Sequence, residues 1–106
     1  MPYNLVFRVR REYFEAIRNG EKTAEFRAVT EFWEVRCTNA NRHLKYKRPV
    51  NAIFICGKEK MTKEVSHITM HVDAERALGR EPSPQGKKDL GDGPVYAFHL
   101  KGGDGK

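Results

Sequence analysis

Apolar and polar side chains alternate with a period of two residues along much of this 106-residue chain, and this pattern constrains the fold more than any other feature. A period of two is typical of β-strands because successive side chains point to opposite faces of a sheet. Two further runs, around Phe54 and Tyr96, are short and rich in apolar residues, which also favours strands. The five predicted strands are residues 5–9, 22–29, 50–57, 62–72 and 94–100.

Helical spacing is clearest in the segment that follows the first predicted strand. Tyr13, Phe14 and Ile17 recur at the spacing of an α-helix. The pair Asn19-Gly20 is typical of the end of such a helix, with a glycine of positive φ closing the last turn. The other segments are predicted as a short helix or strand (30–36), a basic loop (38–49), a turn (58–61), a helical turn (73–79) and a long surface loop of open role (79–94).

The predicted fold class is α+β and mainly β, as a small β-barrel or curled sheet with one or two short helices at its rim. A chain of this length fits one domain with one core. We therefore expect a single domain over residues 1–100 and a flexible tail over residues 101–106. The predicted strand at 62–72 is expected to contain a bulge that switches its faces after Val65.

Charge and cysteine content limit the classes of partner. The formal net charge is +6 and the pI is about 9.5, so an anionic partner is the first candidate. Cys37 and Cys56, in a chain that starts with no signal-peptide pattern, indicate reduced thiols in a cytoplasmic protein. No apolar run approaches the ~20 residues of a membrane span. Since His67 and His71 would lie ~13 Å apart along a strand, we expect no metal, and we expect no cofactor.

Cations and an aromatic residue alternate near the middle of the chain. Arg42, Lys45, Tyr46 and Lys47 are candidate ligand contacts. Cations suit phosphates, and a ring can stack on a base of single-stranded nucleic acid. A solvated basic loop would have the same composition, so both interpretations stay open. Trp33 likewise either stacks on a base or anchors the core.

The strongest candidate site is formed by Lys22, Glu25 and Arg27. Arg27 offers a planar set of donors that suits phosphate or carboxylate, and Lys22 offers a mobile charge. Glu25 could orient Arg27, accept from the amino group of a base, or act as a general acid or base. Alternation places Glu25 and Arg27 on one face of the strand, and Phe26 on the face that can point into a core. A ladder of solvated charges on an exposed strand would use the same residues.

The pattern Gly20-x-Lys22-x-x-Glu25-x-Arg27, which follows a helix and opens a strand, resembles the signature of the ASCH domain, a branch of the PUA-like superfamily. The resemblance extends over about residues 5–100 and implies a small PUA-like β-barrel with a cleft beside the motif strand. It also implies a role linked to RNA, and a few small members are enzymes that act on an acetylated cytidine nucleoside or cut RNA. Glu25 stands where the amidohydrolase-like motif has a hydroxyl proposed as nucleophile, and Thr23 is the nearest hydroxyl.

Three functions are compatible with these residues. The first is a binding module whose basic cleft holds RNA or a nucleotide through Lys22, Glu25 and Arg27, flanked by the basic loop. The second is a small hydrolase acting on a modified nucleoside or on RNA. In that case Lys22 would stabilise charge or act as base, Glu25 would be the general acid or base, and Thr23 or a water would attack. The third is a protein-interaction module with an acidic partner. The oligomeric state is left open.

Overall fold

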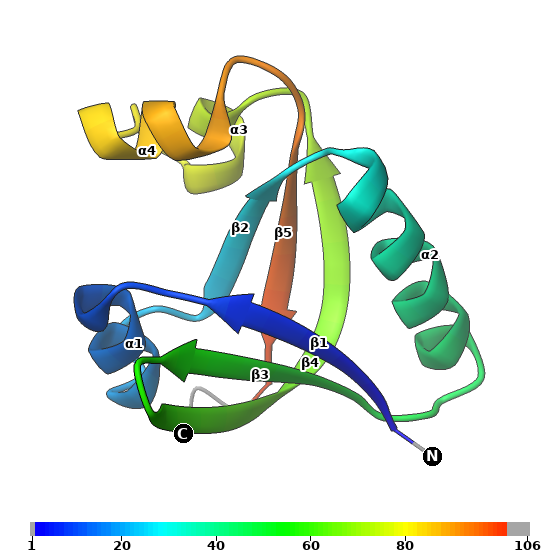
Figure 1. Ribbon diagram of the computed structural model, residues 1–106. Helices are drawn as coiled ribbons and strands as arrows, with labels where there is room; N and C mark the ends of the chain where they lie inside the picture. Colours follow the sequence, from blue (N-terminus) through cyan, green and yellow to red (C-terminus); the bar gives the residue numbers. More distant parts are fainter. Residues whose placement is uncertain (1, 102–106) are drawn as a thin grey trace.

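The computed structural model describes residues 2–101, and over that range it contains a curled five-stranded sheet and four helices (Figure 1). The elements in chain order are β1 (Tyr3–Arg8), α1 (Arg11–Arg18), β2 (Ala24–Ala28), α2 (Glu31–Lys45), β3 (Val50–Cys56), β4 (Glu59–His71), α3 (Ala74–Leu78), α4 (Pro84–Leu90) and β5 (Val95–Leu100).

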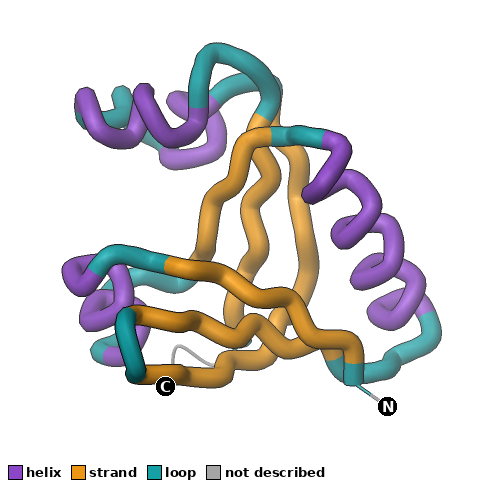
Figure 2. Tube along the Cα trace, viewed as in Figure 1, coloured by secondary structure: helices purple, strands orange, loops and turns teal. Residues whose placement is uncertain are grey.

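The sheet has the strand order β1-β3-β4-β5-β2, which makes β1 and β2 its two edges. β1 runs parallel to β3, and the other neighbours are antiparallel. The long strand β4 joins the two halves of the sheet, because its first part pairs with β3 and its second part with β5. Its register shifts between Val65 and His67, which confirms the predicted bulge. The sheet is therefore a half-barrel that stays open between β1 and β2 (Figure 2).

Aromatic side chains fill the inner face of this sheet. The Phe7 ring stacks on Trp33 with 5.1 Å between centroids and on Phe54 with 5.4 Å, and it meets Phe98 edge-on at 5.0 Å. Burying one such ring contributes about 1.5–3 kcal/mol. Trp33 comes from α2, so this helix closes one open side of the half-barrel. A smaller cluster, in which Phe26 packs partly buried, lies beneath α3 and α4.

The prediction of a basic loop at 38–49 is wrong, because most of these residues belong to the helix α2. The Thr30 side chain accepts a hydrogen bond from the backbone N–H of Trp33 and so caps the helix, and two glutamates occupy its first turn. The buried positions Trp33, Cys37 and Ala40 recur every three or four residues. Abundant cations and asparagines hid that stripe, and the ambiguous segment 30–36 is the start of the same helix.

The predicted loop 79–94 also contains a helix, α4, whose N-cap Ser83 accepts from the backbone N–H of Gly86 at 3.1 Å. Serine followed by proline is a helix-start signal that the glycine and proline content obscured. The helical turn predicted at 73–79 is confirmed as α3, which begins after the cap Asp73. The predicted turn at 58–61 is shorter than expected, because β4 begins at Glu59.

Lys101, the first residue of the predicted tail, is joined to β4 by two contacts. The backbone N–H of Lys101 donates to the carbonyl of Glu64 at 2.8 Å, and its Nζ lies 2.6 Å from the Glu64 carboxylate. Residues 102–106, which make up the rest of that prediction, lie outside the described residues.

Candidate functional site

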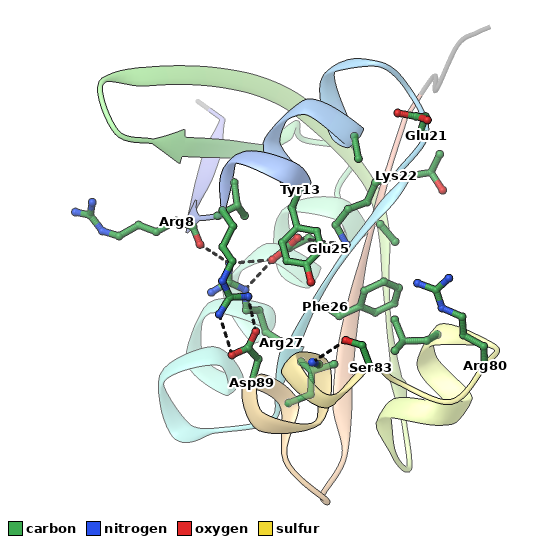
Figure 3. Close-up of a pocket in the computed structure, with 18 residues that line it drawn as sticks. Arg8, Tyr13, Glu21, Lys22, Glu25, Phe26, Arg27, Arg80, Ser83 and Asp89 are labelled. Carbon is green, nitrogen blue, oxygen red and sulfur yellow. Dashed lines mark hydrogen bonds and ion pairs between the residues drawn. The ribbon is translucent and has the colours of Figure 1, made fainter.

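A cleft of about 850 Å³ opens between the α1–β2 region and the α3–α4 segment (Figure 3). One wall comes from the end of β1 and from α1, the floor from β2, and the opposite wall from residues 78–90. The side chains on which its chemistry depends are Tyr13, Lys22, Glu25, Phe26, Arg27 and Arg80.

The turn after α1 places Lys22 in the cleft. The backbone N–H groups of Glu21 and Lys22 both donate to the carbonyl of Ala16, at 2.9 and 3.0 Å. Gly20 has φ +81°, a left-handed conformation that a residue with a side chain adopts at a cost. The predicted positive φ is thus confirmed. The Lys22 Nζ lies 5.4 Å from the ring centroid of Tyr13 and 4.8 Å from that of Phe26, so two aromatic rings flank the ammonium.

Glu25 is the buried carboxylate of the cleft, with 6% of the residue exposed. Its Oε2 accepts from Arg27 Nε at 3.0 Å and lies 2.8 Å from Arg27 Nη2, while its Oε1 lies 3.6 Å from Lys22 Nζ. A carboxylate without these cations would be costly at this depth. The arrangement leaves Oε1 with one long contact and therefore with capacity to accept a further donor.

Arg27 also links the two edges of the half-barrel. Its Nη2 donates to the backbone carbonyl of Arg8 at the end of β1, at 3.0 Å. Its guanidinium lies 5.2 Å from the Phe7 ring centroid and 5.5 Å from that of Trp33, which packs it against the core. Arg27 is therefore a structural clamp as well as a lining residue. In contrast, the guanidinium of Arg8 points away from the cleft (Figure 3).

The pKa of Lys22 lies below its ordinary value, and burial is the main cause. The carboxylate of Glu25 opposes this effect, whereas the positive charges of Arg27 and Arg80 add to it. The Lys22 ammonium therefore loses its proton at a lower pH here than a lysine in water, which makes a neutral amine more accessible.

The opposite wall contributes residues that the sequence analysis did not single out. Arg10 binds Asp89 through two contacts of 2.8 and 3.3 Å, which join the start of α1 to α4. Arg80 lies at the mouth of the cleft and forms no ion pair within residues 2–101. No local sequence pattern could have predicted the Arg10–Asp89 pair, because these two residues are far apart in the chain. The signal for this wall was the helix start at Ser83.

In comparisons with known proteins, no family model, curated protein or solved structure matches the chain. The resemblance to the ASCH domain therefore stays an expectation drawn from the motif. None of the helices in the described range is both long and apolar enough to cross a bilayer.

The structure separates the predicted site residues into two groups. Lys22, Glu25 and Arg27 meet in the cleft, and Thr23 is exposed on its lining. Trp33 does not reach it, because the ring is buried against Phe7 and serves as a core anchor, the second of the two roles weighed for it.

The basic segment is not at the cleft either, so the predicted flanking basic loop is wrong. Arg42 and Lys45 belong to the last turn of α2, and Tyr46 and Lys47 follow its end. None of the four lines the cleft. The helix carries them away from its own start at a rise of ~1.5 Å per residue.

Three of the four histidines form a group of their own on β4 and β5. His67 stacks on His99 with 4.2 Å between ring centroids, and the Thr69 hydroxyl lies 2.8 Å from a ring nitrogen of both His71 and His99. Burial first, then the two neighbouring histidines, lower the pKa of His99. In the described part of the chain no three His, Cys, Asp or Glu side chains are arranged to hold a metal ion.

Proposed function

We propose that the cleft binds a nucleotide, either free or as an exposed unit of a single-stranded RNA. The observation that carries the proposal is the grouping of Lys22, Glu25 and Arg27 beside two aromatic rings in one cleft. A volume of about 850 Å³ falls within the range of ordinary small-ligand pockets. It suits one nucleotide and not a duplex, whose bases are not splayed out.

Each wall of the cleft matches one part of a nucleotide. The ring of Tyr13 or Phe26 offers a stacking surface for a base. The Oε1 of Glu25 suits the exocyclic amino group of cytosine, adenine or guanine. Arg80, exposed at the mouth, suits the phosphate. The resemblance to the ASCH domain supports the same conclusion, and the two free cysteines accord with a cytoplasmic location.

The test is calorimetric titration of the protein with cytidine 5′-monophosphate and with a short single-stranded RNA, at low and at moderate salt. We expect affinity to fall as salt rises, and to fall further in Tyr13→Leu, Glu25→Gln and Arg80→Gln. The double variant Arg42→Gln/Lys45→Gln is the matched control, because it removes cations from the far end of α2. The proposal would be refuted if the affinity did not change with salt concentration, or if it fell in the control variant as much as in Arg80→Gln.

A second candidate function is hydrolysis of a modified nucleoside, and the lowered pKa of Lys22 favours it. The neutral Lys22 amine would take a proton from a water, whose oxygen attacks the amide carbonyl, or from Thr23, whose oxygen would form an acyl ester that a second water then hydrolyses. The protonated lysine would then return that proton to the departing amine. Incubation with N-acetylated cytidine tests this, and turnover should rise with pH through the pKa of Lys22. No product from the wild-type protein, or an unchanged rate in Lys22→Met, would refute it.

A further inference from the structure

β1 is an edge strand whose free side faces a groove of about 630 Å³, which shares Arg8 and Arg27 with the lining of the cleft. In the parallel ladder with β3, the N–H of Tyr3 donates to Pro49 and that of Val9 to Ile55. Odd-numbered residues of β1 thus face β3, and the backbone groups of Asn4, Val6 and Arg8 face the free edge.

These edge groups have capacity for a partner strand. The Arg8 carbonyl accepts from Arg27, which closes one end of the groove. Within residues 2–101, the backbone N–H and C=O groups of Asn4 and Val6 have no hydrogen bond to another part of the chain. Val6 is an exposed apolar side chain, 49% accessible. An unprotected edge of this kind is a template for strand addition.

The opposite wall of the groove is a second stripe of α2. Phe32, Val35, Arg36 and Asn39 are spaced at three and four residues and all line the groove. Phe32 and Val35 are 55% and 54% exposed, so this stripe is apolar and uncovered in the described structure. The buried stripe of the same helix, which begins at Trp33, faces the core instead. β1 and α2 converge near the N-terminus and separate toward the start of α2 (Figure 1).

The charge of the groove selects the partner. Arg8, Arg27 and Arg36 line it, and no carboxylate does. Arg27 is engaged with Glu25, but neither Arg8 nor Arg36 forms an ion pair within the described residues. The Arg36 guanidinium lies 3.4 Å from the Phe32 ring centroid, which holds its charge at the groove. A partner strand with alternating acidic and apolar side chains complements this surface.

We infer that this groove binds an extended acidic peptide segment of another protein by adding it as a strand to the free edge of β1. Backbone hydrogen bonds to Asn4 and Val6 fix the peptide. The apolar side chains on one face of the added strand rest on Phe32 and Val35, and the carboxylates on its other face meet Arg8, while Arg36 adds to the positive charge of the groove. The site does not depend on whether the cleft binds a nucleotide.

The test is amide hydrogen exchange by NMR on the full chain, with a blocked octapeptide that alternates Glu and Val as the probe. We expect the amides of Asn4, Val6 and Arg8 to become protected when the peptide is added, since they face the free edge. A peptide that alternates Lys and Val is the matched control and should leave them unchanged. No added protection at millimolar Glu-Val peptide would overturn the inference.

Variants distinguish strand addition from non-specific electrostatic attraction between the basic protein and the acidic peptide. Val6→Pro removes one edge N–H on the side away from β3, so the fold should persist while peptide binding is lost. Arg36→Glu should weaken binding by about tenfold, and Lys58→Glu on the exposed β3–β4 turn should not. Equal weakening in both charge variants would overturn the inference. So would concentration-dependent protection without peptide, which indicates a second copy on β1, or the same protection produced by single-stranded RNA.

Discussion

Replacing Glu25 by glutamine removes the charge that lies between Lys22 and Arg27 while keeping the shape of the side chain. Breaking a fully buried ion pair costs about 3–5 kcal/mol. The Glu25 side chain is 8% exposed, but that of Arg27 is 25% exposed, so water screens part of the interaction. We therefore expect Glu25→Gln to lower the free energy of unfolding by about 2 kcal/mol. Arg27→Met should cost a similar amount, because the Arg8 carbonyl then loses its donor.

A double-mutant cycle isolates the pair itself. Since the Glu25 and Arg27 contacts are 2.8 and 3.0 Å long, the coupling energy should be about 1–2 kcal/mol. The matched control is the cycle of Glu64→Gln and Lys101→Met, a pair at 2.6 Å whose side chains are 43% and 54% exposed. Its coupling should stay below about 0.5 kcal/mol, because exposed pairs contribute little. Urea unfolding followed by circular dichroism measures all variants, and equal couplings in the two cycles would refute the reasoning.

Three further predictions concern stability and reactivity. Burial raises the pKa of Cys37 to about 12, so a thiol reagent should label Cys56 in the folded protein and reach Cys37 only on unfolding; labelling of both at one rate would contradict this. The pKa of His99 is lower in the folded state than in the unfolded chain, so stability should fall as pH drops below about 6.5, and His99→Gln should reduce that loss, measured as urea midpoints at neutral and mildly acidic pH. Gly20→Ala should lower the free energy of unfolding by about 1–2 kcal/mol. The cost comes from the backbone, because φ is +81°, and not from a clash, because no atom lies within 4 Å of an added Cβ; an unchanged urea midpoint would contradict this.

The strands could be predicted from the sequence because alternation is a local signal. All five lie at the predicted places, and the bulge after Val65 follows from the exchange of apolar positions in β4. The helix end at Gly20 was also readable, since positive φ favours one residue type. What alternation could not give is which strands pair, and hence the parallel β1–β3 edge and the opening between β1 and β2.

The site could be predicted only in part, because its residues come together through tertiary packing. The three residues of the motif, Lys22, Glu25 and Arg27, line one cleft. Charge density on its own gave a wrong prediction for the basic segment. Buried residues at every third or fourth position make most of this segment part of a helix, and the helix carries its cations away from the cleft. Tyr13 was predicted as a helical residue without a role, and its ring becomes part of the cleft only because the turn at Gly20 folds Lys22 back over it.

The measurement that tests the central claim most directly is an amide NMR titration of the protein with cytidine 5′-monophosphate at low salt. A nucleotide in the cleft should shift the amides of Tyr13, residues 22–27 and Arg80 together, with one dissociation constant. Amides at the end of α2, residues 42–47, should stay in place, because they lie outside the cleft. Shifts confined to residues 42–47, or no saturable shift at the cleft, would contradict the account.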